Sequence, residues 1–204
     1  MYDLLLISPI NTQLGRFKRF VPRSVPIGVG IIAGFMRKKG FSVKIIDQEL
    51  VDINKKSIEV FLKECKKPYI VGISAMTANV ASGYKIAEDI KSVDKEATVI
   101  FGGIHPTVMP DEILKEGSVD FIVKVEAEYT FLELVQQIKS GRIDRDKLEN
   151  IGFVEDGQIF YTKPATKMVD VNDVPMFPYD MYDSSKYNLG FILTSRVCPF
   201  DCIF

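Results

Sequence analysis

Five short apolar runs, separated by stretches with helical spacing, constrain the fold of residues 1–141 more than any other feature of the sequence. The runs occupy residues 4–7, 42–47, 69–74, 98–101 and 119–123. Their nearly continuous apolar character is typical of strands that are buried on both faces of a parallel sheet. Right-handed connections and the need to cover both faces predict a doubly wound α/β sheet with strand order 2-1-3-4-5.

Apolar residues at helical spacing fill the gaps between these runs. They predict helices at 27–39, 57–65, 84–90 and 131–138, and a short one at 113–114. The first ends in basic residues followed by Gly40, and the last stops at Gly141, as suits helix C-termini.

The pattern changes after residue 141. Two β-rich segments, 151–154 and 159–161, flank Asp156-Gly157 and predict a hairpin. Residues 163–188 hold three prolines among acidic residues and predict an extended linker, and residues 190–195 predict a sixth strand. We therefore expect an α/β domain at 1–145, a hairpin and linker at 146–190, and the beginning of a further domain at 191–204.

Composition narrows the classes of function. The formal net charge of −1 gives no basic excess for nucleic acid or an anionic membrane. No apolar run approaches the roughly 18 residues of a membrane span, and Met1–Ile7 lacks the basic start of a signal peptide. Three cysteines exclude a disulfide scaffold and fit a reducing cytoplasm.

Polar residues follow the predicted strands at the edge where open parallel sheets bind ligands. Ser8-Pro9 follows the first strand and opens a long connection carrying Arg16, Lys18, Arg19 and Arg23, which is either functional or a solvated basic loop. Residues 74–79 follow the third strand. Thr77 or Asn79 would cap the next helix, and the remaining polar groups, with Ser74 and Met76, suggest a hydrogen-bonded ligand.

Paired glycines follow the fourth strand, in Gly102-Gly103-Ile104-His105-Pro106-Thr107. Glycines permit close approach of a ligand and expose amide N–H groups, so we expect Gly103→Val to block binding. His105, the sole histidine, is structural or contacts the ligand, with metal ligation as a minor alternative. Glu126 and Glu128 follow the fifth strand and either suit a helix N-terminus or form an acid–base pair.

Gly28-Val29-Gly30 followed by Asp47 is similar to a dinucleotide-binding fingerprint. That fingerprint must lie in the turn directly after the first strand, whereas these glycines fall inside a predicted helix. Small residues there favour close packing of the helix on the sheet. A nicotinamide-dependent Rossmann enzyme remains an alternative only if this region wraps a pyrophosphate.

Taken in order, these segments resemble the N-terminal part of a cobalamin-binding radical SAM protein. That family joins a flavodoxin-like cobalamin domain to a partial TIM barrel that holds a [4Fe–4S] cluster. Gly102–Thr107 carries most of the resemblance in the first domain. Residues 126–130, Glu-Ala-Glu-Tyr-Thr, resemble the family's Gly-Glu-x-Glu-x-Thr segment, with Val125 in place of the usual glycine.

The end of the chain resembles the start of the radical SAM motif C-x₃-C-x₂-C. Cys198 and Cys202 fit its first two positions, and the third cysteine would be residue 205. In the full-length parent, three thiolates would bind the cluster and its open iron would bind S-adenosylmethionine. With two of three ligands, we expect this fragment alone to be non-catalytic. A zinc site made of Cys198, Cys202 and Cys65 is a weaker alternative.

The resemblance implies cobalamin as the ligand and a missing C-terminal radical SAM domain as the partner. The parent would catalyse methyl transfer or a radical rearrangement. The segment directly after the first strand contains no histidine, so the chain lacks the D-x-H-x-x-G histidine that would contact the lower face of the corrin. The resemblance also implies that the nucleotide tail would lie in a groove along the sheet. The alternative within the family is a corrin-free docking or substrate-recognition domain. The expected cofactor-binding residues are Ser8, Pro9, Ser74, Met76, Thr77, Gly102, Gly103, His105, Pro106, Thr107, Glu126 and Glu128.

Overall fold

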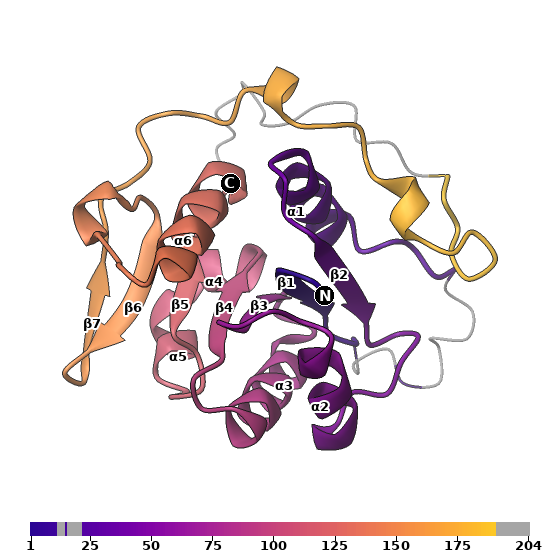
Figure 1. Cartoon of the computed structure of the whole chain (residues 1–204), viewed down its shortest axis with the longest axis horizontal. Helices are drawn as coiled ribbons and strands as arrows, with labels where there is room; N and C mark the ends of the chain where they lie inside the picture. Colours follow the sequence, from indigo (N-terminus) through magenta and orange to yellow (C-terminus); the bar gives the residue numbers. More distant parts are fainter. Residues whose placement is uncertain (12–14, 16–21, 191–204) are drawn as a thin grey trace.

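The computed structural model describes residues 1–11, 15 and 22–190 and has a mostly parallel sheet at its centre (Figure 1). The strand order is β2-β1-β3-β4-β5-β6-β7, and the first five strands are parallel, as the sequence predicts. The strands are β1 (Leu4–Ser8), β2 (Val43–Asp47), β3 (Ile70–Ser74), β4 (Thr98–Gly102), β5 (Phe121–Val123), β6 (Ile151–Glu155) and β7 (Gln158–Tyr161).

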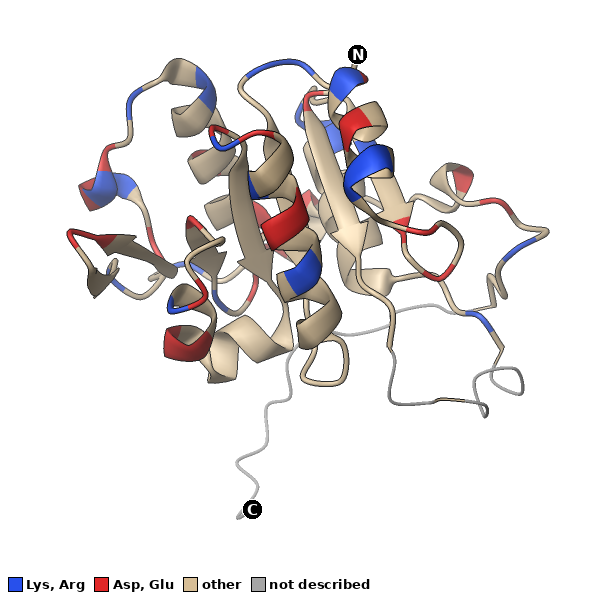
Figure 2. Ribbon diagram, turned by 90° about the horizontal axis from the view of Figure 1, so that it is seen from below, with Lys and Arg blue, Asp and Glu red and all other residues tan. Residues whose placement is uncertain are grey.

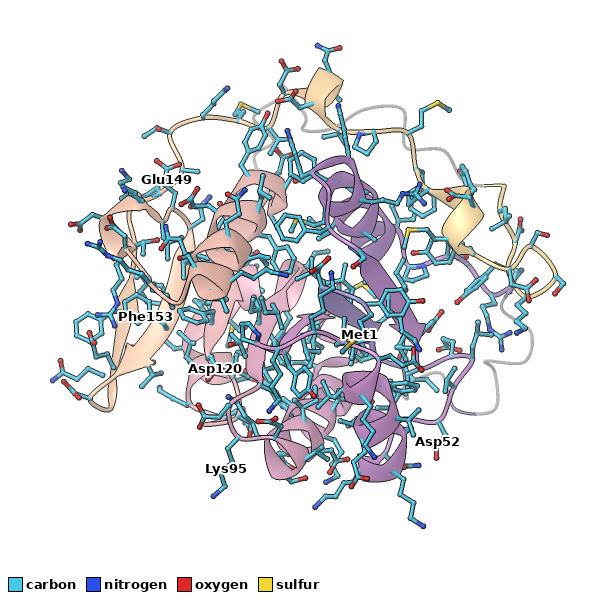
Figure 3. All side chains as sticks on the ribbon, viewed as in Figure 1. Met1, Asp52, Lys95, Asp120, Glu149 and Phe153 are labelled. Carbon is cyan, nitrogen blue, oxygen red and sulfur yellow. The ribbon has the colours of Figure 1, made fainter. Side chains whose placement is uncertain are left out.

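The predicted hairpin forms and extends the same sheet. Strand β6 pairs antiparallel with β5, and β7 pairs antiparallel with β6, which gives seven strands where five parallel strands were expected. Asp156 and Gly157 both have positive φ, 48° and 74°, as a two-residue hairpin turn of this hand requires. The ring of Phe153, labelled in Figure 3, stacks on Phe160 of β7 and is tilted against Phe121 of β5.

Six α-helices connect or follow the described strands. One of them, α4, is additional to the sequence prediction and follows directly after Gly103. The helices are α1 (Ile27–Lys38), α2 (Lys55–Lys63), α3 (Val80–Val93), α4 (Ile104–Val108), α5 (Pro110–Leu114) and α6 (Glu128–Ser140). Gly141 ends α6 in the left-handed conformation, as expected for a C-terminal glycine.

The helices divide between the two faces of the sheet. Strand residues such as Leu6, Ile100 and Val123 form one buried cluster with α1 and α6. Their neighbours in the strands, such as Ile7 and Phe101, form a second cluster with α2, α3 and α5 on the opposite face. This alternation, which follows from the two-residue period of a strand, confirms burial on both faces.

The linker, residues 163–188, packs along the outer side of α1. Phe177 lies so close to Gly30 that a Cβ at Gly30 would be 2.4 Å from the phenyl ring, and Pro178 lies against Gly34 in the same way. The expectation that the small residues of the Gly28-Val29-Gly30 segment serve packing on the sheet is therefore wrong for Gly30, and Gly34 has the same role as Gly30. They make room for the linker. Arg37 adds an ion pair with Asp180.

A buried hydrogen bond also holds the linker. Asp47, at the end of β2, is 5% exposed and accepts hydrogen bonds from the Tyr187 hydroxyl at 2.8 Å and from the Glu49 amide at 2.8 Å. Burial raises the pKa of the Asp47 carboxyl, and the two hydrogen bonds oppose this effect by favouring the ionised form.

No helix among the described residues has the length and apolar character needed to cross a membrane. Basic and acidic residues are both spread over the elements that Figure 2 colours, in keeping with the near-zero net charge.

We expect Tyr187→Phe to lower the free energy of unfolding by about 1–3 kcal/mol at pH 7, because a buried carboxylate loses a donor. The lost bond favours ionised Asp47, so its removal raises the pKa further. The cost is present above that pKa and is lost as the pH falls through it. Urea unfolding of both proteins at pH 7 and at about pH 4 measures this loss of unfolding free energy. Tyr182→Phe is the control, since its hydroxyl makes only a 3.5 Å bond to the Pro26 carbonyl. An equal loss for Tyr187→Phe at both pH values would contradict the explanation.

Candidate functional site at the carboxyl edge of the sheet

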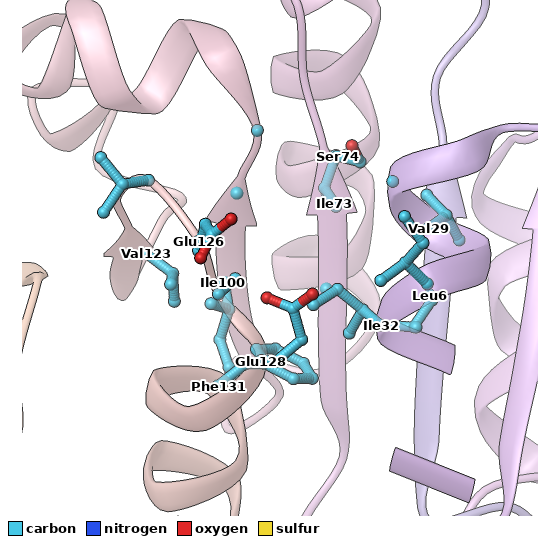
Figure 4. Close-up of a pocket in the computed structure, with 17 residues that line it drawn as sticks. Leu6, Val29, Ile32, Ile73, Ser74, Ile100, Val123, Glu126, Glu128 and Phe131 are labelled. Carbon is cyan, nitrogen blue, oxygen red and sulfur yellow. The ribbon is translucent and has the colours of Figure 1, made fainter. Parts of the chain in front are cut away.

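A cavity of about 260 Å³ lies between α1 and α6, over the carboxyl-terminal halves of β1, β3, β4 and β5 (Figure 4). This volume is close to the lower end of the roughly 300–1,000 Å³ that small-molecule pockets occupy. Among the lining residues, only Ser74, Glu126 and Glu128 have polar side chains. The lining consists of Leu6, Gly28, Val29, Ile31, Ile32, Gly72, Ile73, Ser74, Ile100, Gly102, Gly103, Val123, Val125, Glu126, Ala127, Glu128 and Phe131.

Glycines keep part of this cavity open. A Cβ at Gly102 would meet no atom closer than the Val123 carbonyl oxygen at 4.0 Å, and a Cβ at Gly28 none closer than Ser74 Oγ at 3.8 Å. Gly72 differs, because a Cβ there would lie 2.7 Å from Leu6. Gly102 and Gly28 therefore leave space that a larger side chain could fill, whereas Gly72 is needed for packing beneath the cavity.

Gly103 has a role that the sequence did not predict. Its φ is 105°, and a Cβ there would lie 2.7 Å from the carbonyl oxygen of Ala75. Although Gly103 lines the cavity, its missing side chain makes room for the loop after β3. Gly103→Val would disturb the backbone whether or not a ligand binds here, so that change does not test the predicted role of Gly103 in a ligand site.

The His105 ring lies outside the cavity lining and is 3% exposed. Its Nδ1 shares a hydrogen bond of 3.1 Å with the Thr77 hydroxyl, and its Nε2 lies 3.4 Å from Glu112 Oε1. Nε2 is buried and makes no hydrogen bond of good geometry. His105 thus connects the loop after β3 with α4 and α5.

Asn79 and Thr107 brace the other loops at this edge. Asn79 accepts a hydrogen bond from the Met76 amide at 2.7 Å and donates to the Pro9 carbonyl at 3.0 Å. It does not cap α3, and Thr77 bonds to His105, so the predicted helix cap is wrong for both residues. Thr107 donates to the Gly103 carbonyl at 2.9 Å and accepts from the Val125 amide at 3.0 Å.

Exposed apolar side chains surround the same edge. Met76 follows β3, Ile104 and Val108 belong to α4, and Val125 follows β5; each is at least half exposed. Single exposed apolar residues are common, but these four lie on the segments that follow three adjacent strands, β3, β4 and β5. We call these four residues the apolar edge.

Glu128 opens α6 and is 2% exposed. Its carboxylate points into the cavity among Ile32, Ile100 and Phe131 (Figure 4). Glu126 lines the same cavity. Glu128 lies in the first turn of the helix, as one sequence interpretation expected, where the helix dipole favours negative charge.

The predicted site residues fall into two groups. Ser74, Gly102, Gly103, Glu126 and Glu128 line the cavity. The others lie beyond the strands: Ser8 ends β1, Pro9, Met76 and Thr77 lie in the loops after β1 and β3, and α4 after β4 contains His105, Pro106 and Thr107. Sequence reasoning missed the apolar lining from α1 and α6, such as Ile32 and Phe131, because no local pattern distinguishes it from ordinary core.

Cys198 and Cys202 lie outside the described residues. Cys65 is buried, with its thiol 3.3 Å from the Phe61 carbonyl oxygen. Within residues 1–11, 15 and 22–190, no group of three or more His, Cys, Asp or Glu side chains could hold a metal ion.

The structure gives no support to a dinucleotide fingerprint. Gly28 and Gly30 lie within α1, where Phe177 covers Gly30. Each carboxylate oxygen of Asp47 already accepts a hydrogen bond, one from Glu49 and one from Tyr187. This carboxylate is therefore engaged within the chain and does not face a cofactor ribose.

The doubly wound sheet and its edge cavity define an α/β domain built to bind a small molecule beyond the carboxyl ends of its strands. Residues 16–135 match the B12 binding domain family, which covers more than half of the chain. The chain belongs to the B12-binding domain family.

Curated relatives extend the similarity along the chain. An uncharacterised methyltransferase of Pyrococcus horikoshii is 31% identical across 100% of the chain, which spans 45% of that protein. The anaerobic magnesium-protoporphyrin IX monomethyl ester cyclase of Rubrivivax gelatinosus is 27% identical across 88% of the chain, which spans 34% of the cyclase. The chain thus spans less than half the length of these relatives.

Solved structures share the fold. The cobalamin-dependent S-adenosylmethionine radical enzyme OxsB, with aqua-cobalamin and S-adenosylmethionine bound, aligns with a TM-score of 0.70 at 19% identity, over 89% of this chain and 24% of OxsB. The radical S-adenosylmethionine methyltransferase TsrM of Kitasatospora setae, with cobalamin and a [4Fe-4S] cluster bound, aligns with a TM-score of 0.66 at 20% identity. That alignment covers 86% of this chain and 31% of TsrM.

Val125 adopts an unfavourable backbone conformation beside the cavity. Its φ is 54°, in the left-handed region that β-branched residues rarely adopt, and its side chain is 58% exposed. This is the position at which the resembling family segment has glycine. The valine therefore carries backbone strain with little packing to offset it.

We expect Val125→Gly to raise the free energy of unfolding by about 1 kcal/mol, because glycine adopts positive φ without steric cost. Urea unfolding of the two proteins measures the difference. Val125→Ala should raise the free energy of unfolding by less, since alanine keeps a Cβ. A destabilised Val125→Gly would show that packing of the valine outweighs its strain.

Proposed function

We propose that this chain binds cobalamin at the carboxyl edge of its sheet, as the cofactor-carrying part of a radical SAM enzyme. The observation that carries the proposal is the apolar cavity between α1 and α6, kept open by Gly28 and Gly102. It lies where open α/β sheets bind ligands, in a chain that belongs to the B12-binding domain family.

The residues present fit the two parts of this cofactor. The cavity has apolar walls for a flat base and a few polar groups for a nucleotide tail, among them the Ser74 hydroxyl. The apolar edge gives the corrin ring a surface to lie on, beside Ser8 and Pro9. Thr77, His105 and Thr107 hold the loops that form this surface, and Pro106 lies in the same turn of α4.

Bound cobalamin supplies a cobalt centre that can carry a methyl group. The names of the relatives, methyltransferases and a cyclase, support methyl transfer or a radical rearrangement as the reaction of the parent protein. We propose residues 1–145 as the cobalamin domain, 146–190 as hairpin and linker, and 191–204 as the start of a radical SAM barrel. Cys198 and Cys202 would then be two of three ligands to a [4Fe–4S] cluster that binds S-adenosylmethionine in that parent, and this fragment alone would not catalyse.

The first test is direct uptake of the cofactor. Purified protein mixed with excess hydroxocobalamin and then desalted should retain corrin absorbance in the visible spectrum at close to one equivalent per chain. A folded protein that elutes without corrin would contradict the proposal and favour a corrin-free docking domain. Retained NADH fluorescence in a parallel sample would favour the nicotinamide alternative.

The second test reduces the volume of the cavity by enlarging a residue of its wall. Gly102→Val should weaken cobalamin binding by about tenfold or more, because its methyl groups occupy the space for the nucleotide tail. Gly102→Ala should give a smaller loss. Absorbance titration measures affinity, and circular dichroism verifies folding.

Ala165→Val, on the exposed linker, is the control for added volume. Unchanged affinity in a folded Gly102→Val protein would place the nucleotide tail elsewhere.

A further inference from the structure

The linker contacts both helices that form the walls of the cavity. In Figure 1 it runs from the side of α6 across to the outer side of α1. Residues 175–180 pack on α1, where they meet its glycines and Arg37. Residues 170–173, which precede them, contact α6 instead. One continuous segment, residues 170–180, therefore bridges the two helices.

The contacts with α6 and with α1 meet at Asp173. Its carboxylate accepts a hydrogen bond of 2.6 Å from the hydroxyl of Tyr129 in α6. Its carbonyl oxygen accepts a hydrogen bond of 2.9 Å from Nζ of Lys38, the last residue of α1. The Asp170 amide donates to the same Tyr129 hydroxyl at 3.3 Å. Asp173 thus connects α6 to α1, through its side chain and its backbone respectively.

The hydrogen bond between Tyr129 and Asp173 is charge-assisted. Together with the charges of Lys39 and Lys38, it holds the pKa of the Asp173 carboxyl below its usual value. The same hydrogen bond raises the pKa of the Tyr129 hydroxyl. At neutral pH the tyrosine therefore keeps its proton and donates it to an ionised carboxylate. Hydrogen bonds of this kind are stronger than those between neutral groups.

Tyr129 and Asp173 lie beside the cavity without lining it. Tyr129 is located between Glu128 and Phe131 in α6, and both of these residues belong to the lining. The Tyr129 ring packs edge-on against Phe35 of α1, with the ring centroids 5.9 Å apart. A change at Tyr129 or Asp173 therefore affects a ligand in the cavity through the positions of α1 and α6.

We propose that Asp173 is a positioning residue, which joins α6 to α1, fixes the separation of these helices and thereby sets the affinity of the cavity for cobalamin. The effect on affinity rests on the proposed function, whereas the effect on the helices does not. Such coupling is reciprocal, so a ligand that fills the cavity also stabilises the contacts of the linker.

Titration with hydroxocobalamin, followed by visible absorbance, tests the effect on the ligand. Asp173→Ala should weaken binding about fivefold, because the hydrogen bond to α6 is lost. Asp173→Asn keeps an oxygen that accepts from Tyr129, so it should bind within about twofold of the native chain. An affinity of Asp173→Asn as low as that of Asp173→Ala would overturn the proposal.

A double-mutant cycle tests whether the two residues act as a pair. Tyr129→Phe should weaken binding as much as Asp173→Ala, because it removes the same hydrogen bond from the other side. The double variant should bind no more weakly than either single variant, since the bond can be lost only once. Losses that add in the double variant would contradict the proposal.

Amide hydrogen exchange of the same proteins without cobalamin tests the effect on the helices. Asp173→Ala should speed exchange in α1 and α6 about fivefold and leave α2 and α3 unchanged, because local opening follows the loss of local contacts. Unchanged exchange in α1 and α6 would overturn the proposal even if the affinity falls. If the native chain binds no cobalamin, the proposed function fails, and hydrogen exchange still decides whether Asp173 positions the helices.

Asp111→Ala is the matched control, because it removes a hydrogen bond of the same kind elsewhere in the fold. Asp111 belongs to α5 and accepts a hydrogen bond from the hydroxyl of Tyr161 in β7. Helix α5 packs on the face of the sheet opposite α1 and α6, so the affinity and the exchange of α1 and α6 should remain at native values. Circular dichroism verifies that each variant is folded. Equal losses of affinity in Asp111→Ala and Asp173→Ala would indicate a general loss of stability and overturn the proposal.

Discussion

The gap between α1 and α6 depends on one reversal in the order of the strands. The chain moves from β1 to β2 in one direction and then from β2 through β3, β4 and β5 in the other. Right-handed connections place α1 on one face of the sheet and the helices of the later crossovers on the opposite face. Among the helices of the described residues, only α6, after the last parallel strand, returns to the face of α1. The middle strands are thus left without a helix of their own on that face, and the cavity lies there.

Individual residues determine the shape and polarity of the cavity that the topology leaves between α1 and α6. Gly102 and Gly28 keep parts of the wall free, while Leu6 and Phe131 close the floor around Gly72. Glu128 places a carboxyl group in a cavity whose other lining is mostly apolar. The loops beyond the strands are braced by side chains rather than left loose, since Asn79 and Thr107 each connect neighbouring loops. A ligand that enters a preformed cavity orders few residues, and this limits the entropic cost of association.

The sequence predicts well what local patterns determine. The five parallel strands, their order and the turn at Asp156-Gly157 follow from apolar runs, connection handedness and turn chemistry. Functions that depend on distant neighbours were not predictable. Gly103 meets Ala75, and Gly30 meets Phe177, more than 140 residues away. Thr77 binds His105 instead of capping α3. The cavity itself is a space between α1 and α6, which contribute to it from opposite ends of the domain.

Helix α1 contacts both the linker and the cavity, because one side of the helix lines the cavity and another packs against the linker. Gly28, Val29 and Ile32 line the cavity, whereas Gly30 and Gly34 receive Phe177 and Pro178 of the linker. The position of α1 over the sheet, and with it the width of the cavity, therefore depends on contacts made some 150 residues further along the chain. The buried bond between Tyr187 and Asp47 and the ion pair between Arg37 and Asp180 hold the linker in this position. Residues 175–187 are thus part of the structure that shapes the cavity, although none of them lines it.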